Sequence, residues 1–291
     1  MSPARPEVSL PGLRPGVHWT RRVANRVAIG GCVLATALVV LPLALLVYRL
    51  LESGLHGLSL GFFLHMPKPV GEAGGGMANA IVGTLIVVGI GAAIAVPVGV
   101  AAGVYLAEYG REQLANVVRY TADVLAGAPS IVVGVAVFGL LVVPMGRFSA
   151  LAGGVALAVL MLPTVVRATE EVVRLVPASY RQAALALGAP SWVATLRVVL
   201  PAARAGVTTA ALLAVARASG ETAPLLFTAL GNRFWSVHLD QPIATLPVMI
   251  YDYARAPYSD WNSQAWTGAL TLLVLVTVLS ALMRLATRNI R

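Results

Sequence analysis

Long apolar runs alternate with polar segments along most of the chain. Five of these runs carry no charged residue, and a sixth is interrupted only by Arg217 and Glu221. A helix rises about 1.5 Å per residue and needs about 20 residues to cross about 30 Å of hydrocarbon, and these runs reach or approach that length. None alternates polar and apolar side chains as a barrel strand would. The pattern predicts an all-α polytopic membrane protein with six spans, at residues 27–48, 77–107, 124–146, 148–166, 205–230 and 265–283.

Positive charges fall mainly on alternate polar segments. With the N-terminus placed inside, the inner segments hold fifteen arginines, whereas the outer segments hold four arginines and Lys68. Cytoplasmic segments of membrane proteins carry the excess of basic residues. The distribution therefore predicts that both termini are cytoplasmic and that 170–204 is the longest inner loop.

The first 26 residues are rich in Pro, Gly and Arg, which predicts a mobile cytoplasmic tail at 1–26 before a membrane domain at 27–291. The apolar run at 27–48 is longer than the roughly 7–15-residue core of a signal peptide, and no small-residue cleavage site follows it. We therefore expect a retained span.

Composition agrees with a membrane protein. Of the 291 residues, 58% are hydrophobic and 11% are charged, against about 25% charged in soluble domains. The net charge of +9 does not indicate a nucleic-acid partner, because the basic residues lie between apolar runs. We expect lipid contact and no nucleic acid.

Sequence motifs for catalysis are absent. The chain has no G-x-x-x-x-G-K-[ST] phosphate-binding loop, and its single lysine is Lys68, in a predicted outer loop. It has no H-E-x-x-H motif, and Cys32 is its only cysteine. We therefore predict that the chain is not an enzyme and holds no metal or cofactor, so that any ATP is hydrolysed by a partner.

The predicted inner loop contains a pattern typical of a helix–turn–helix. The alanine-rich segment 182–188 favours a helix, and Gly188 at its end permits a turn. Pro190 can begin a second helix, and Pro201 is expected to interrupt that helix before the next span. Such an element would lie across the inner membrane face and fit a groove on a partner.

This loop resembles the cytoplasmic EAA loop of ABC importer permeases. Their pattern is Glu-Ala-Ala, three residues, Gly, nine residues, an aliphatic residue, any residue and Leu-Pro, and the chain departs from it only at Gln182, which stands in the Glu position. The resemblance implies the type I ABC importer permease fold, with a cytoplasmic coupling helix that docks on an ATPase. The residues that it assigns to coupling are Gln182, Ala183, Ala184, Gly188, Leu200 and Pro201.

The sixth run carries two charges within a predicted span. Arg217 lies about 18 Å along the span, where a charge costs at least about 2.5–3.5 kcal/mol and needs a partner or water. Glu221 shares its helix face at four residues' distance. Either the two residues form a structural ion pair, with each other or with Asp123, or Arg217 is a fixed positive site for an anion whose binding Glu221 limits. A pair that opens and closes would satisfy both hypotheses.

Two further segments resemble phosphate-specific (Pst) permeases of the A type. Residues 216–226 match A-R-x-x-G-E-T-A-P-L-L, and 125–134 match L-x-G-x-P-S-I-V-x-G. The resemblance extends from about residue 81 to the C-terminus and implies a role in phosphate transport for the Arg and Glu of the first segment. The predicted pathway residues are Arg217, Glu221, Thr222, Pro129 and Ser130.

The resemblance also implies partners. These are a second, C-type permease, two copies of an ATPase subunit that bind ATP and Mg²⁺, and an extracytoplasmic phosphate-binding protein, all at the bacterial inner membrane. Two alternatives stay open. One is an ABC permease for another oxyanion, such as sulfate or molybdate, and the other is an ion-coupled secondary carrier that works without ATP.

Overall fold

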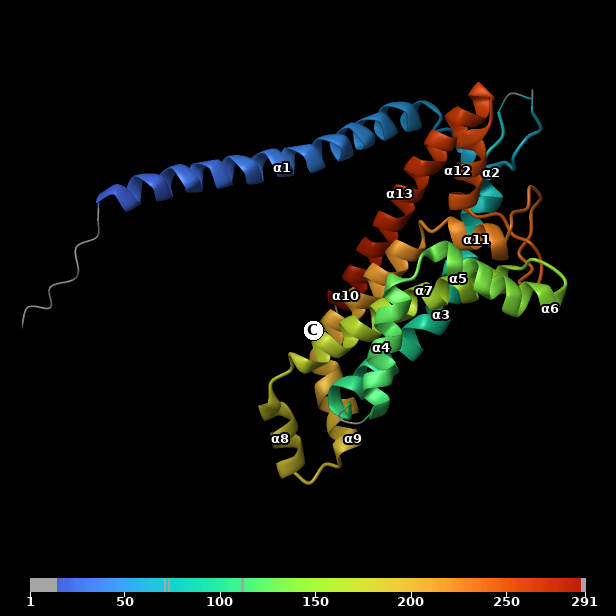
Figure 1. Cartoon of the computed structure of the whole chain (residues 1–291). Coiled ribbons are helices and arrows are strands. Elements are labelled where there is room, and N and C mark those ends of the chain that lie inside the picture. The colour runs from blue at the N-terminus through green and yellow to red at the C-terminus, as the bar shows by residue number, and fades with distance from the viewer. Residues whose placement is uncertain (1–14, 71, 73, 111–112, 289–291) are drawn as a thin grey trace, which may run out of the picture. The chain divides into compact units, whose positions relative to one another are not determined.

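A computed structural model describes residues 15–70, 72, 74–110 and 113–288 (Figure 1). The chain divides into two compact units, residues 1–51 and 52–291. Helix α1 (Pro15–His56) fills the described part of the first unit and continues into the second. Residues 15–26 of the predicted mobile tail are thus helical, and proline suits the first turn of a helix, whereas its first fourteen residues lie outside the described part. The mobility and the cytoplasmic location of the tail stay a prediction.

Within the second unit, α3 (Ala78–Glu108) and α7 (Ala150–Arg174) pack closely along their length. Glycines make this possible. A Cβ atom on Gly99 would lie 2.7 Å from the side chain of Val165, and one on Gly103 would lie 2.6 Å from that of Thr169. Residues without side chains let membrane helices approach closely, so α3 and α7 form one tightly packed pair.

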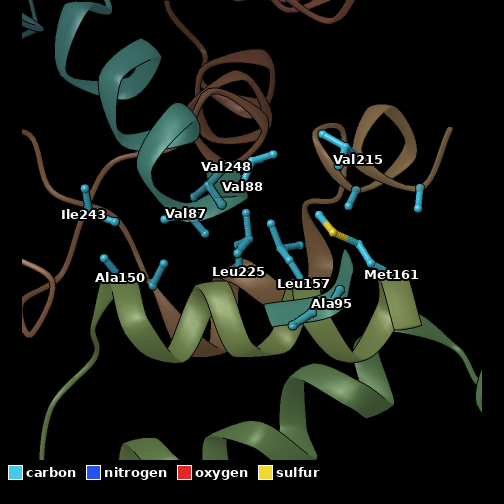
Figure 2. Close-up of a cluster of buried hydrophobic side chains, with 14 of the residues drawn as sticks. Val87, Val88, Ala95, Ala150, Leu157, Met161, Val215, Leu225, Ile243 and Val248 are labelled. Atoms are coloured by element: carbon cyan, nitrogen blue, oxygen red, sulfur yellow. The ribbon is translucent and has the colours of Figure 1, made fainter. Parts of the chain in front are cut away.

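The largest hydrophobic core lies around this pair. Figure 2 shows side chains of α3 and α7 gathered with others from α10 (Leu200–Ala218), α11 (Ala223–Thr228) and α12 (Leu246–Arg255). Helices α10 and α11, which form one of the two broken spans described below, thus share one core with α3, α7 and α12. Its larger members include Val87, Leu157, Met161, Val215, Leu225 and Val248.

The predicted span 124–146 is not one straight helix. Helix α4 (Gln113–Gly127) ends before Pro129, and the chain then bends by 107° into a second helical stretch. Proline has no N–H and disfavours a helical conformation in the residue before it, so a break at this position has a direct cause. The second stretch consists of α5 (Ser130–Val137), a π-helical turn η1 (Phe138–Val142) and α6 (Val143–Met145).

The predicted span 205–230 is also broken, because α10 ends at Ala218 and α11 begins only at Ala223. At its other end, α10 continues directly from α9 (Ser191–Ala194) through a π-helical turn η2 (Thr195–Val199). The prediction that Pro201 interrupts this helix is wrong. A π turn widens the backbone ladder just before the proline and accommodates it.

Three further helices complete the described chain, and two of them are short. Of the described helices, five are long and apolar enough to cross a membrane, or six if the bent pair α4 and α5–α6 counts as one span. This agrees with the six apolar runs. The remaining elements are α2 (Leu60–Leu64), α8 (Ala178–Ala186) and α13 (Ser259–Arg288).

Candidate functional site

A cavity of about 250 Å³ lies where the two broken helices meet α7. Its walls come from the last turn of α4, the first turn of α5, the middle of α7 and the end of α10. Thr222 does not line it. The four predicted pathway residues that the structure brings together on this cavity are Pro129, Ser130, Arg217 and Glu221.

The two helix breaks contact each other at Gly134, a residue without a side chain. A Cβ atom on Gly134 of α5 would lie 2.6 Å from the Cα atom of Pro224, in the first turn of α11. Only glycine permits this approach of two backbones. The contact explains why segments 125–134 and 216–226, distant in sequence, form one site.

Arg217 and Glu221 do not form the predicted ion pair. Within the described residues, neither side chain takes part in a salt bridge, and Asp123 instead pairs with Arg167 at 3.1 Å between Oδ1 and Nε. Helical spacing would place Arg217 above Glu221, but α10 ends at Ala218 and Glu221 lies beyond it. Neither predicted form of the structural ion pair is therefore present among the described residues, and a pair that opens and closes stays a prediction.

The cavity combines one guanidinium, one carboxylate and hydroxyl groups. Arg217 lies in the last turn of α10, where the helix dipole favours a positive charge. Ser130 and Thr164 each carry a hydroxyl on the wall. Guanidinium and hydroxyl donors suit the oxygens of an anion, while the nearby carboxylate opposes tight binding.

Thr164 was missed by sequence reasoning. It belongs to an uncharged apolar run and to neither of the motifs that carry the resemblance. Its one available signal was a hydroxyl directly after Pro163, inside a predicted span.

A second charged group surrounds Glu170 of α7, whose side chain is 2% exposed. Its carboxylate forms salt bridges with three arginines, with Arg119 Nε at 2.7 Å, Arg167 Nη1 at 3.2 Å and Arg174 Nη2 at 2.6 Å. Arg119 belongs to α4 and the other residues to α7. Sequence reasoning counted these arginines as loop charges, so this network, which ties α4 to α7, was not foreseen.

The predicted helix–turn–helix is present as α8 and α9 (Figure 1). Gly188 between them has φ +83°, a conformation that favours glycine, and Pro190 is the residue before α9, as expected. Gln182 is exposed, and so is Leu187, whose exposed fraction is 89%. The turn thus presents an apolar tip, while Leu200 and Pro201 lie farther along, at the start of α10.

Comparisons with known proteins agree with this geometry. The family model for the binding-protein-dependent transport system inner membrane component matches residues 99–291, which include the cavity and the α8–α9 turn. The phosphate transport system permease protein PstA of Yersinia pestis is 46% identical over 268 residues, or 91% of this chain and 90% of the relative. The protein of the same name from Haemophilus influenzae is 42% identical over 92% of this chain and 95% of its own.

A solved structure shows the same fold. The inward-facing MetNI methionine ABC transporter aligns with 74% of this chain and 94% of its own chain, with a TM-score of 0.58 and 20% sequence identity. At that identity the likeness concerns the arrangement of helices alone.

Proposed function

Because this chain belongs to the PstA family of binding-protein-dependent inner-membrane transport components, we propose that it is a permease subunit that carries inorganic phosphate in an ATP-driven importer. It is a multi-pass inner-membrane protein. Its family is not enzymatic and works together with ATPase subunits and other permease subunits. The observation that carries the proposal is the cavity in which Arg217 and Glu221 face one space without a salt bridge between them.

In this proposal Arg217 attracts the anion. Its planar guanidinium can donate two parallel hydrogen bonds to phosphate oxygens, and the Ser130 hydroxyl adds a donor beside it. Glu221 offsets the positive charge, so that the anion is held weakly enough to leave. Pro129 maintains the break that opens the cavity, and Thr222, beyond its wall, stays a predicted pathway residue.

The free energy of ATP hydrolysis would be transmitted to this chain through the α8–α9 turn. We expect ATP and Mg²⁺ to be bound by two ATPase subunits on the cytoplasmic side, with the apolar tip at Leu187 inserted in a groove between or on them. A C-type permease would complete the membrane pathway, and an extracytoplasmic binding protein would deliver phosphate. Both chain termini are cytoplasmic in this arrangement, as the arginine distribution supports.

The test is uptake of radiolabelled phosphate at low micromolar concentration by cells that lack this chain. The cells are complemented with the native chain, Arg217→Gln or Arg217→Lys at equal membrane levels. Loss of charge-assisted hydrogen bonds worth about 1.5–3 kcal/mol predicts a roughly 10- to 160-fold slower uptake for Arg217→Gln. Arg217→Lys, which keeps the charge but not the planar fork, should fall between.

Each other outcome rejects a defined part of the proposal. Full uptake with Arg217→Gln would leave a phosphate permease in which Arg217 has only a structural role. No uptake with the native chain would reject phosphate, and the assay would be repeated with sulfate and molybdate. Uptake that survives ATP depletion but stops when the ion gradient is dissipated would indicate a secondary carrier.

A further inference from the structure

Helix α8 precedes the turn that the proposed function places against the ATPase, and it is called the docking helix below. One of its side chains contacts the ends of two core helices. Arg181 Nε donates to both carboxylate oxygens of Glu108, at 2.9 and 3.0 Å, and its Nη2 also donates to that carboxylate. Its Nη1 donates to the carbonyl of Val176 at 2.7 Å, and its Nη2 to that of Val173 at 3.0 Å. Every guanidinium nitrogen is therefore bonded to the protein.

The place of this pair makes a positive charge necessary there. Glu108 is the last residue of α3, and Val173 lies in the last turn of α7. Helix C-termini carry partial negative charge, and a carboxylate at such an end adds to it. Arg181 places one positive charge against both ends, and the Glu108 carboxylate in turn raises the pKa of Arg181.

The pair is also shielded from water, unlike an ordinary surface salt bridge. The Glu108 side chain is 10% exposed and the Arg181 side chain 24%. By contrast, Arg147 and Asp240 form a pair at 2.9 Å with side chains 54% and 47% exposed. A forked, shielded pair of this kind holds a fixed geometry, whereas an exposed pair contributes little.

From Glu108 the contacts continue to the cavity. In the described residues, the side chains of α8 and α3 are hydrogen-bonded to each other only through Arg181 and Glu108. The same end of α3 is bonded to α4, because Arg119 Nη2 donates to the carbonyls of Leu106 and Gly110 at 3.0 and 3.1 Å. Helix α4 ends at the cavity wall, and α7, which packs tightly against α3, contributes Thr164 to it.

We propose that the Arg181–Glu108 pair is the fixed joint through which movement of the docking helix reaches α3, α4 and the cavity, so that Arg181 is a positioning residue for transport. This rests on the proposed function, since it requires an ATPase bound to the α8–α9 turn. The Arg181–Glu108 pair connects the α8–α9 turn to α3 through side chains, in addition to the backbone that connects the turn to α7 and α10. Loss of the joint should therefore uncouple ATP hydrolysis from transport without removing the ATPase.

The experiment uses the complete importer in proteoliposomes and measures phosphate transported per ATP hydrolysed. For Arg181→Gln and Glu108→Gln this ratio should fall roughly 5- to 150-fold, the range by which one site usually changes the affinity of a coupled site. ATPase subunits should still co-purify with both variants. The matched control is Arg147→Gln, which removes an arginine from an exposed ion pair and should leave the ratio unchanged. Unchanged ratios in both joint variants would overturn the proposal.

A second measurement separates a fixed joint from mere loss of fold. Cys32 is the sole cysteine, so Glu108→Cys and Arg181→Cys in a Cys32→Ser chain can be joined by a short reducible bis-thiosulfonate linker. Linked importer should recover the transport ratio, and reduction of the linker should abolish it again. A linked importer that stays uncoupled would overturn the fixed joint. If Arg181→Gln does not assemble, Arg181→Lys keeps the charge without the fork and should show an intermediate ratio, and a native ratio would count against the proposal.

A third readout does not depend on phosphate. In the Cys32→Ser chain, Ala128→Cys places a thiol on the cavity wall, and its labelling should change when ATP is added to a complex with an intact joint. Arg181→Gln should abolish that ATP-dependent change. A native complex that carries no phosphate would reject the proposed substrate, while this labelling would still decide whether the joint couples the cavity to ATP. Retained labelling changes in Arg181→Gln would reject the joint alone.

Discussion

Two groups of charged residues in this chain differ in whether their charges are paired within the protein. Glu170 is buried and forms salt bridges with three arginines, so each charge of this group has a partner inside the protein. Arg217 and Glu221 share a cavity wall, yet within the described residues they form no salt bridge. A charge in a membrane protein is expensive without a partner. The satisfied group is therefore expected to hold the fold, and the open group to meet something that comes from outside.

The largest loss of stability is expected when Glu170 is replaced. In Glu170→Gln the buried carboxylate no longer balances Arg119, Arg167 and Arg174, and breaking such a buried pair costs about 3–5 kcal/mol. The variant should fail to accumulate in the membrane, as measured by immunoblotting of membrane fractions. Glu171→Gln, at the exposed neighbouring position, is the matched control and should accumulate normally. Equal amounts of both would show that the network is not structural.

A smaller effect is expected where the two breaks touch. Gly134→Ala would place a Cβ atom 2.6 Å from Pro224 Cα, and such overpacking costs about 1–3 kcal/mol. The thermal unfolding temperature of the purified complex should fall, and uptake should fall with it because the cavity wall shifts. A Cβ atom on Gly139, in the same helical stretch, meets no atom within 4 Å, so Gly139→Ala should change neither. Equal behaviour of the two variants would contradict a role for this contact.

The smallest effect on stability is expected at the open charges. Arg217→Gln and Glu221→Gln remove no salt bridge, so each should change the free energy of unfolding by no more than about 0.5 kcal/mol. Thermal unfolding of the purified complexes measures this. A large loss of stability in either variant would show that this charge stabilises the fold, as Glu170 is expected to do. Such a loss in Arg217→Gln would make Arg217 a structural residue.

Much of this arrangement could be predicted from the sequence because it depends on local signals. Apolar runs marked the long helices, and the left-handed turn at Gly188 follows from the only residue type that adopts it without strain. The motifs that carry the resemblance gave four residues of one cavity. These successes share a cause, since each feature is set by residues close together in the chain or by a motif read as a unit.

The prolines show where such reasoning ends. Pro97 and Pro163 lie inside continuous helices, whereas Pro129 stands at a break with a bend of 107°. Pro201 follows a π turn without any break. In all these positions the local chemistry is the same, and the surrounding helices decide whether the freed backbone groups are satisfied. Sequence spacing cannot supply that information.

The partner of Asp123 was hidden for a similar reason. Its bond to Arg167 joins α4 to α7, and the choice between Arg167 and Arg217 depends on how these helices pack. The sequence suggested Arg217 as the partner because Asp123 stands at the start of the predicted third span and Arg217 lies within the predicted fifth span. The packing of α4 against α7, which a single helix pattern does not reveal, brings Asp123 to Arg167.

The contact between Gly134 and Pro224 also has an evolutionary consequence. A side chain can appear at position 134 only if the backbone at position 224 retreats, so the two positions are not free to drift independently. Among descendants of a common ancestor, a change at one should be accompanied by a change at the other, while the open position Gly139 varies alone. An ancestral sequence reconstruction can then read the history of the two breaks as one inherited trait.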